Sequence, residues 1–530
     1  MRWDEARAQV AYAQHWWVRE TLADALHQAA LKTPERVVIV DADARLDCRT
    51  LHARAVSLAR GLLGRAASGS VVSFMLPNWH EAAVIYHAAT LAGMVVHPIL
   101  PSLRDRELTF MLQDVDSRII FIPSTLRSHD FSTMLERVAA QLGRPPQVVV
   151  VRGDPGPHIS FASLFEDSVQ SLPTLEPEAV RMVLYTSGTS GSPKGVLHSH
   201  NSIHALVRQI GRHWLVRPGD TYLVASPVSH IGGSIYAFEC PLLLGMRAIL
   251  MERWDADAAV QLLLAEGCTH MAGATPFLVQ LLAAAQRAQT RLPDLKLFIC
   301  GGASVPPSLI RQAAAYFEHA AVTRVYGSTE VPVITVGTPD RDDLFHAAET
   351  DGAVGIAEVR LVDSAGRHAD EGEILARGPQ MLVGYLHAES EAGVFDQDGY
   401  YRTGDIGRRV DGNYLVVSGR AKDIIIRNGE NISPKEVEDV LAEHPAIKEV
   451  AVVGLPDART GERACAIIVL KKKNDAPDID GLRTFLSAQG LAVFKYPEEV
   501  VVWEVLPKND AGKILKHKIR AQLMQRTAGS

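Results

Sequence analysis

The sequence predicts an α/β fold: a large N-terminal domain of several subdomains, with layered parallel sheets and a β-rich subdomain, and a small α+β C-terminal domain. Three observations support this. The chain has 530 residues, more than one hydrophobic core usually serves, so two or more domains are expected. Between residues 180 and 327, short apolar runs alternate with amphipathic stretches, which favours parallel α/β layering. After Gly352, short strands with turn signals replace that pattern.

The α/β part contains apolar runs of strand length separated by helical patterns. One helix is expected over Asp255–Glu266, where an acidic first turn leads into apolar residues and Gly267 closes the helix. Residues 20–170 show the same alternation of strand-like and helical patterns. The Pro- and Glu-rich stretch Ser171–Glu178 is typical of a connector between the two parts. The expected strands are Tyr222–Ala225, Ala248–Met251, Thr269–Ala272 and Leu295–Cys300.

The last part of the chain changes pattern twice. Turn signals at Asp363–Gly366 and at Asp411-Gly412 favour antiparallel hairpins. Beyond Gly419–Asp423 a compact α+β segment follows, and we place the main domain boundary there. This segment contains a helix start in which Ser433 is the cap, Pro434 the first helical residue and Glu436 the partner in a capping box.

Composition narrows the function. A hydrophobic content of 47% with 22% charged residues is ordinary for a soluble enzyme, and a net charge of −7 disfavours nucleic acid as a partner. The five cysteines are scattered and odd in number, which indicates reduced thiols and a cytoplasmic location. Asp4 and Glu5 stand where a secretory leader would be apolar. The most apolar stretch, Ala82–Val96, contains His87 and is expected to be a buried helix, so no membrane span is predicted.

The segment Tyr185–Gly195, reading YTSGTSGSPKG, carries glycines, hydroxyl side chains and Lys194, a combination typical of a polyphosphate site. Gly195 follows Lys194 where a Walker loop would have Ser or Thr, so an ordinary P-loop is not expected. A flexible linker is the alternative. Against it, an apolar segment precedes the loop and a helical pattern, Ser199–His213, follows, which is a phosphate-binding layout.

Five motifs occur in the order and approximate spacing of the adenylate-forming superfamily, which the chain resembles over nearly its whole length. That superfamily comprises acyl-CoA synthetases, adenylation domains of peptide synthetases and firefly luciferase. The motifs are Tyr185–Gly195, Tyr326–Glu330 (YGSTE), Tyr401–Asp405 (YRTGD), Gly419–Asp423 (GRAKD) and Pro507–Lys513 (PKNDAGK).

The resemblance implies an ATP-dependent carboxylic acid:CoA ligase that uses ATP, Mg²⁺ and CoA. Such an enzyme forms acyl-AMP and pyrophosphate, and then acyl-CoA and AMP, with rotation of the C-terminal domain between the two steps. It implies an N-terminal domain over residues 1–419, a hinge at 420–423 and a C-terminal lid domain over 424–530. The N-terminal domain is expected to divide into subdomains of about 1–175, 176–345 and 346–419.

The resemblance also implies the site residues. Lys513 would bridge the attacking carboxylate and the α-phosphate, Glu330 would ligate Mg²⁺ with Thr186 as a second candidate ligand, and Thr329 would contact the α-phosphate. Lys422 would be the hinge, and Gly429 would border the thiol channel. The polyphosphate loop would use Thr186, Ser187, Gly188, Thr189, Ser190, Gly191 and Lys194. The nucleoside would be held by Gly301, Gly302, Ala303, Tyr326, Gly327, Ser328, Asp405 and Arg420.

The acid is expected to be a medium-sized apolar or cyclic carboxylate. His230 stands where the family closes the acyl pocket, and Ile231 replaces the aspartate by which amino-acid-activating relatives pair a substrate ammonium. Gly327 stands where acetate-specific relatives have a tryptophan that shortens the pocket. The segments Val71–Trp79 and Arg104–Met111 look like those of short- and medium-chain and cyclohexanecarboxylate-type CoA ligases. Two features depart from the family: Arg49-Thr50 replaces a Thr-Tyr pair, and Gly355-Ile-Ala lacks the usual proline.

Other interpretations stay open at this point. The chain could load a carrier protein, or act as a noncatalytic sensor of nucleotide or acyl-adenylate, although Lys194, Glu330 and Lys513 argue against a sensor. A homo-oligomer is compatible with the sequence. A metal site at His198, His200 and His204 is disfavoured, because no carboxylate or cysteine set accompanies them.

Overall fold

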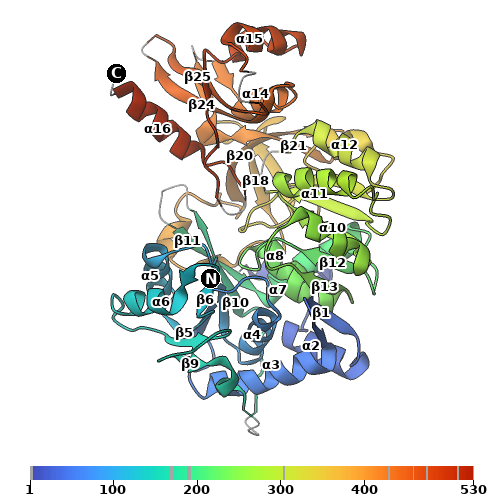
Figure 1. Cartoon of the computed structure of the whole chain (residues 1–530), viewed down its shortest axis with the longest axis vertical. Coiled ribbons are helices and arrows are strands. Elements are labelled where there is room, and N and C mark those ends of the chain that lie inside the picture. The colour runs from blue at the N-terminus through green and yellow to red at the C-terminus, as the bar shows by residue number, and fades with distance from the viewer. Residues whose placement is uncertain are drawn as a thin grey trace.

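The computed structural model describes residues 4–166, 171–187, 193–302, 305–427, 430–457, 459–472, 476–509 and 512–528. In this part of the chain the strands form two large sheets, a four-stranded antiparallel sheet and a five-stranded C-terminal sheet, with a small ribbon of β6 (Thr125–Leu126) and β7 (His129–Asp130). The C-terminal domain lies at one end of the long axis (Figure 1). The structure therefore has the predicted α/β class, with a large N-terminal and a small C-terminal domain.

The first large sheet has the order β19-β11-β10-β4-β3-β5-β8-β9. Its strands are parallel from β10 to β9, whereas β11 is antiparallel to both of its neighbours. The bounds are β3 Val71–Phe74, β4 Val95–Pro98, β5 Ser117–Ile122, β8 Gln147–Val150, β9 Ile159–Ser160, β10 Val180–Ser187, β11 Pro193–Ser199 and β19 Gly384–Tyr385.

The second large sheet has the order β16-β15-β14-β12-β13-β1-β2 and is parallel except for the β1–β2 hairpin. It contains all four strands predicted between residues 222 and 300. The bounds are β1 Val37–Asp41, β2 Ala44–Asp47, β12 Thr221–Val224, β13 Arg247–Leu250, β14 His270–Gly273, β15 Leu297–Gly301 and β16 Ala321–Val325.

The two sheets exchange strands across the subdomain limit expected near residue 175. Strand β1, from the first segment, pairs with β13 of the second, while β10, from the second segment, pairs with β4 of the first. A boundary drawn along the sequence thus does not separate the sheets. The subdomain limits, like the other domain limits, stay predictions.

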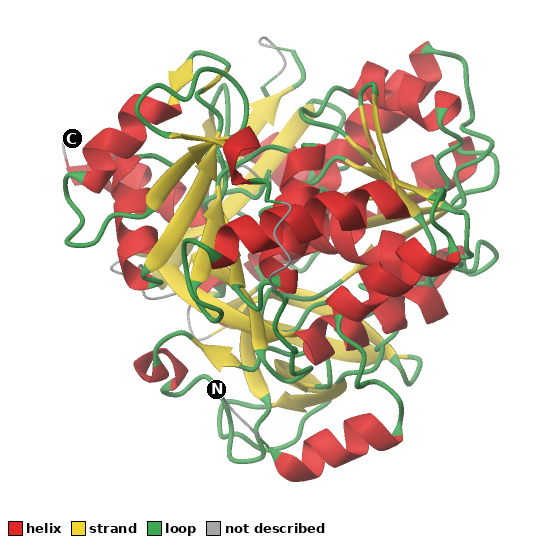
Figure 2. Ribbon diagram, turned by 90° about the horizontal axis from the view of Figure 1, so that it is seen from below, coloured by secondary structure: helices red, strands yellow, loops and turns green. Residues whose placement is uncertain are grey.

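Helices pack between and outside the two sheets, as Figure 2 shows. The largest apolar core joins α3 and α4 to strands of both sheets, for example Val72 of β3 and Tyr222 of β12. The helix α4 is buried along almost its full length, as predicted for this apolar stretch, but it ends at Leu91, and Val95 and Val96 belong to β4 instead. The N-terminal-domain helices are α1 Glu5–Ala13, α2 Leu22–Lys32, α3 Cys48–Leu63, α4 His80–Leu91, α5 Asp105–Asp114, α6 Phe131–Ala139, α7 His200–His213, α8 Ile231–Ser234, α9 Cys240–Leu243, α10 Ala256–Ala265, α11 Thr275–Arg287, α12 Pro307–Tyr316 and α13 Leu344–Glu349.

The β-rich part consists of antiparallel hairpins, as the turn signals predicted. Asp411 and Gly412 both have positive φ, of 44° and 79°, at the turn between the last two strands. The C-terminal domain packs helices on its own sheet. The bounds are β17 Glu358–Val362, β18 Glu371–Arg377, β20 Tyr401–Val410, β21 Tyr414–Arg420, β22 Ile425–Arg427, β23 Glu430–Ile432, β24 Ile447–Asp457, β25 Gly461–Leu470, β26 Glu499–Val502, α14 Pro434–Leu441, α15 Ile479–Ala488 and α16 Lys516–Ala528.

Local signals for helix ends are confirmed with one correction. Asp255 caps α10, Gly267 follows it with a φ of 58°, and Ser433 caps α14 by accepting the Glu436 N–H. The Glu436 carboxylate, however, binds Lys495 Nζ at 2.6 Å, so the ion pair takes the side chain that a capping box would use.

The cysteines are all free and buried. Among the described residues, no helix is both long and apolar enough to span a bilayer.

Candidate active site

The glycine-rich loop connects the strands of a β-hairpin. Thr186 pairs with Lys194 and Ser187 with Pro193, so β10 and β11 continue to the loop on both sides. The predicted strand, loop and helix layout is therefore wrong in one respect, because a strand lies between the loop and α7. Backbone pairing of β11 with both β10 and β19 keeps this segment extended. Gly188, Thr189, Ser190 and Gly191 lie outside the described residues, as does the side chain of Ser187.

Glu330 lies beside the end of β10. Its Oε1 accepts a hydrogen bond from Thr186 Oγ1 at 3.3 Å and one from Tyr385 Oη at 3.2 Å, and the side chain is buried. Lys194 Nζ lies 5.4 Å from the Tyr385 ring centroid and donates to the backbone oxygen of Ser390 at 3.2 Å. The structure thus gathers a carboxylate, a hydroxyl and a lysine from separate motifs, and oxygen ligands of this kind suit Mg²⁺.

Tyr385 was not predicted as a site residue. It belongs to the two-residue strand β19, which pairs with β11, so the hairpin brings it under Lys194. Burial and the Glu330 carboxylate raise the pKa of Tyr385 far above its usual value, which keeps it a hydrogen-bond donor to Glu330. A lone tyrosine in a glycine-tyrosine pair gives no sequence signal for this position.

Residues 326–335, called here the YGSTE loop, fold back on themselves. Tyr326 and Thr335 close the base, through Thr335 N to Tyr326 O at 3.1 Å and Tyr326 N to Thr335 Oγ1 at 2.8 Å. The backbone oxygen of Glu330 accepts from Leu382 N at 2.7 Å. The loop is therefore fixed to the β19 side of the molecule as well as to its own base.

His198 holds the YGSTE loop from the hairpin side. Its Nε2 donates to the backbone oxygen of Thr329 at 2.8 Å, and its Nδ1 lies 3.1 Å from Ser202 Oγ. Burial lowers the pKa of His198 to about 4, so the ring is neutral at physiological pH. The sequence indicated this histidine only as a disfavoured metal ligand.

Tyr326 and Arg420 meet at the Asp405 carboxylate. Tyr326 Oη donates to Asp405 Oδ2 at 2.7 Å, and Arg420 Nε lies 3.0 Å from Asp405 Oδ1. Asp405 and Arg420 are partners in register across β20 and β21, so the last strand before the expected hinge carries this arginine. Three motifs that lie far apart in the sequence therefore converge on one carboxylate.

Two of the nucleoside-site glycines have clear steric roles. A Cβ at Gly301 would lie 2.9 Å from Val325 O, and Gly302 has a φ of 80°, which side chains rarely adopt. A Cβ at Gly327 would lie 2.5 Å from Val333 N, so the returning backbone of the YGSTE loop fills that space. This is a packing reason for Gly327, and its effect on pocket depth stays a prediction. Ser328 N donates to Val331 O within the loop, and Ala303 lies outside the described residues.

Lys513 reaches the N-terminal domain from a tight turn. Its backbone N donates to Asn509 Oδ1 at 2.8 Å, and Lys508 and Ile514 form an antiparallel bridge. A Cβ at Gly512 would lie 3.2 Å from Pro276, so the turn abuts the start of α11. Desolvation and the nearby Arg420 lower the pKa of Lys513, while Asp405 opposes this shift. The charges of Asp405 and Arg420 thus act on Lys513, which comes from the C-terminal domain.

The expected hinge residue Lys422 is exposed in the short turn η4 (Ala421–Asp423) directly after β21. A groove of about 1150 Å³ separates the antiparallel sheet from the C-terminal domain next to this turn, with Arg402, Arg408 and Lys435 among its lining residues. The chain between the domains is therefore short and accessible. Gly429 lies outside the described residues.

His230 is the N-cap residue of α8, which continues into a π-helical turn, η2 (Ile235–Glu239). A Cβ at Gly233 would lie 2.0 Å from Pro227 O, so glycine is required where this helix turns back on the preceding loop. Ile231 is half-buried and packs against the main apolar core. Single-turn π-helices often occur at functional sites.

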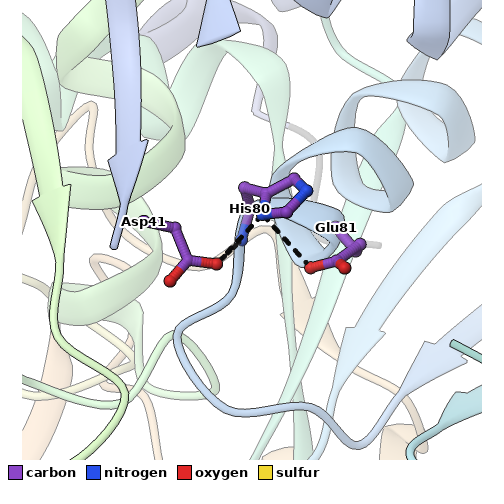
Figure 3. A group of neighbouring side chains, drawn as sticks. All are labelled: Asp41, His80 and Glu81. Carbon is purple, nitrogen blue, oxygen red and sulfur yellow. Dashed lines mark hydrogen bonds and ion pairs between the residues drawn. The ribbon is translucent and has the colours of Figure 1, made fainter. Parts of the chain in front are cut away.

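One further group of polar side chains connects the end of β1 to the start of α4 (Figure 3). His80 Nδ1 lies 3.0 Å from Asp41 Oδ2 and 3.4 Å from Glu81 Oε2, and among the described residues this is the group whose ligand atoms lie close enough for a metal ion. Arg152 binds both carboxylates, at 3.0 and 2.7 Å. Because the guanidinium already supplies the positive charge, we interpret the group as an ion-pair network.

Two family models match this chain, and related proteins and a solved structure match nearly its whole length. Residues 26–386 match the family described as AMP-binding enzyme, and residues 436–513 match its C-terminal domain. The chain is 34% identical to the medium-chain fatty-acid–CoA ligase of Escherichia coli K12, over 99% of this chain and 94% of that protein. It is 30% identical to the 2,3-dihydroxybenzoate-AMP ligase of Bacillus subtilis 168, over 99% and 97%. The crystal structure of ATP-bound MatB from Rhodopseudomonas palustris matches with a TM-score of 0.84 and 26% identity, over 95% of this chain and 99% of that chain.

Proposed function

This chain belongs to the AMP-binding enzyme family as an AMP-forming acid–thiol ligase, and from that premise we propose that it converts a medium-sized apolar or cyclic carboxylic acid into its CoA thioester. The observation that carries the proposal is the meeting of Tyr326 and Arg420 at Asp405, with Lys513 approaching from the C-terminal domain, where Gly512 lies beside Pro276 of α11. That lysine supplies positive charge where a carboxylate attacks a phosphate.

In the first half-reaction, a carboxylate oxygen of the acid attacks the α-phosphorus of ATP. The bond from that phosphorus to the bridging oxygen breaks, and pyrophosphate leaves with the bond electrons. Thr186 and Lys194 hold the polyphosphate, and Thr329 contacts the α-phosphate. Glu330, with Thr186 beside it, would hold Mg²⁺, which supplies positive charge to the polyphosphate.

The nucleoside is held at the carboxylate shared by Tyr326 and Arg420. Asp405 keeps lone pairs free besides those taken by Tyr326 and Arg420, so it accepts from the ribose hydroxyls. Gly301 and Gly302 let the backbone approach the adenine closely. Binding at Asp405 places the α-phosphate next to Lys513, which comes from the other domain.

The second half-reaction needs a different arrangement of the C-terminal domain. The CoA thiol loses its proton to solvent, its sulfur attacks the acyl carbonyl carbon, and the bond from that carbon to the AMP oxygen breaks. We assign the N-terminal domain to residues 1–419, the hinge to 420–423 and the lid to 424–530. Rotation at Lys422 withdraws Lys513 and brings Gly429 to the thiol channel. The exposed η4 turn and the groove beside it support this assignment.

The acid side of the site is apolar. Ile231 and Val325 are half-buried, pack against the main core and stand next in sequence to His230 and Tyr326. Val333, three residues after Glu330, packs against the same core. An apolar surface of this kind favours an uncharged acyl group over an amino acid, because burying an unpaired ammonium is costly. The relative named medium-chain fatty-acid–CoA ligase supports the same substrate class.

The test is acid-dependent exchange of labelled pyrophosphate into ATP over a panel of carboxylic acids, followed by product analysis with CoA. We expect exchange with medium-chain and cyclic acids and formation of their CoA thioesters. Exchange without a CoA thioester would show that the acceptor is a carrier protein. Absence of exchange with every acid would overturn the proposal and favour a sensor.

A further inference from the structure

The YGSTE loop contains a strained residue, Val333, three positions after Glu330. Val333 has a φ of 49°, in the left-handed region that β-branched residues rarely adopt. Such residues persist where surrounding structure holds them, and they cluster at functional sites. The neighbouring Val331 and Ile334 are buried, so the loop has little room to relax around Val333.

The side chain of Gln209 holds this residue in place. Gln209 lies on α7 and is fully buried. Its Nε2 donates to the backbone oxygen of Val333 at 2.9 Å, and its Oε1 accepts the backbone N–H of Ile356 at 2.7 Å. A Cβ at Gly355 would lie 2.1 Å from Gln209 Oε1, so glycine leaves the room that the amide needs.

The second of these bonds uses the backbone N–H of Ile356 as its donor. The residue after Gly355 is isoleucine, and the stretch Gly355-Ile-Ala lacks the proline often found after that glycine in the family it resembles. A proline has no backbone N–H to donate. Ile356 therefore provides the hydrogen that orients the Gln209 amide, which in turn leaves Nε2 to donate to Val333.

The backbone of Val333 contacts the part of the YGSTE loop that carries Thr329 and Glu330. A Cβ at Gly327 would lie 2.5 Å from Val333 N, and Ser328 N donates to Val331 O at 3.1 Å, so the two sides of the loop are in contact. Thr329 and Glu330 lie between these contacts. A change in the backbone at Val333 would therefore shift both residues.

We propose that Gln209 is a positioning residue: by bridging Val333 O and Ile356 N, it holds the strained Val333 backbone and thereby sets the positions of Thr329 and Glu330. The catalytic consequence rests on the proposed function. The effect of Gln209 on the order of the YGSTE loop does not rest on it. Hydrogen–deuterium exchange measures this structural effect, and pyrophosphate exchange measures the catalytic one.

The structural test is hydrogen–deuterium exchange of the segment 326–335 in the full-length protein. We expect Gln209→Met, which keeps the volume and removes both hydrogen bonds, to raise exchange in this segment at least tenfold. The control is Gln380→Met. Gln380 is equally buried, and its amide has no hydrogen-bond partner among the described residues, so its replacement should leave exchange of 326–335 unchanged. Unchanged exchange in Gln209→Met would overturn the inference.

A second background tests the link to strain. Glycine adopts the left-handed region freely, so in a Val333→Gly protein the loss of Gln209 should matter less. We expect Gln209→Met to raise exchange of the segment several-fold less in the Val333→Gly protein than in the wild type. An equal effect in both backgrounds would show that Gln209 supports the fold generally, and would contradict the proposal.

The catalytic readout is pyrophosphate exchange. We expect Gln209→Met to lower the kcat of adenylation by about ten- to a hundredfold, the size of effect that small misplacements produce, with a smaller change in the KM for ATP. Ile356→Pro should lower kcat in the same direction, because it removes the N–H that orients the amide. If wild type exchanges normally while Gln209→Met keeps its kcat, the positioning role is wrong. If wild type exchanges with no acid, the proposed function is wrong instead.

Discussion

The Nε2 of His198 donates a 2.8 Å hydrogen bond to the backbone oxygen of Thr329, and this bond connects the β10–β11 hairpin to the YGSTE loop. Replacing His198 by leucine would leave that carbonyl without its donor. We expect a loss of stability of about 1–3 kcal/mol and a drop of about tenfold or more in the kcat of pyrophosphate exchange. Exchange kinetics together with urea unfolding of the purified variant check this.

The matched control is His97→Leu. His97 is also fully buried and neutral, but its Nδ1 lies beside Ser73 in the interior of the first sheet. We expect this variant to lose stability while its folded fraction keeps the wild-type kcat. An equal loss of kcat in both variants would show that the His198 effect is general rather than local.

Lys513→Ala is expected to affect the two half-reactions differently. In the proposed mechanism the lysine supplies positive charge at the α-phosphate, so its removal should lower adenylate formation by about a hundred- to a thousandfold. Thioester formation from supplied acyl-adenylate and CoA should remain close to wild type, because we propose that Lys513 leaves the site before that step. Lys518→Ala, a change on α16 outside the PKNDAGK motif, is the control. Equal loss of both half-reactions in Lys513→Ala would contradict domain rotation.

The free energy of unfolding should decrease as the pH is lowered, because several buried histidines are neutral in the folded protein. Burial lowers the pKa of His87, His97 and His204 to about 3 and that of His198 to about 4. In the unfolded chain these rings take up protons near pH 6.5. The unfolded state thus binds more protons as pH falls below about 6.5, and each histidine lowers the free energy of unfolding by about 1.4 kcal/mol per pH unit until its folded pKa is reached.

Urea unfolding at a series of pH values between 7.5 and 4.5 measures that slope. His204 offers the sharpest comparison, since neither ring nitrogen has a partner among the described residues. We expect His204→Leu to reduce the slope of the free energy of unfolding against pH by about 1.4 kcal/mol per pH unit, which corresponds to one proton. The free energy of unfolding at pH 7.5 should not fall. A slope identical to wild type would mean that His204 is not neutral in the folded state.

Arg181 and Glu239 form an ion pair in the core, 2.6 Å apart and each about 1% exposed. Tyr86 Oη donates to the same Glu239 oxygen at 2.5 Å. Glu239→Gln would leave the guanidinium buried without a counter-charge, so we expect a loss of about 3–5 kcal/mol in the free energy of unfolding. The double variant Arg181→Met, Glu239→Leu should lose clearly less, and a double variant as unstable as Glu239→Gln would argue against the ion pair as the cause.

The sequence predicts local features well in this protein. The strands of the second sheet, the cap at Asp255, the cap at Ser433 and the hairpin turn at Asp411-Gly412 each depend on residues within a few positions of one another, and the structure contains all of them. The motifs likewise predicted, by resemblance, that Thr186 and Glu330 share one site and that Tyr326, Asp405 and Arg420 surround one nucleoside, and in the structure the residues of each set are in contact.

Features that depend on distant pairing were not predicted. The strand exchange between the two large sheets requires β1 to pair with β13, and no local sequence pattern predicts that pairing. The strand β11, between the glycine-rich loop and α7, pairs with β10 and also with β19, almost two hundred residues later. Tyr385, His198 and Gln209 act through backbone and side-chain contacts across such pairings, so their residue types alone gave no signal.

In the proposed reaction a carboxylate oxygen is transferred to the α-phosphate of ATP, and isotope tracing tests that step most directly. An acid that supports pyrophosphate exchange is labelled with ¹⁸O in its carboxylate and incubated with ATP and CoA, and the nucleotide product is analysed by mass spectrometry. We expect AMP that carries one labelled oxygen for each thioester formed. Label in inorganic phosphate with ADP as the nucleotide product, or AMP without label, would contradict the account.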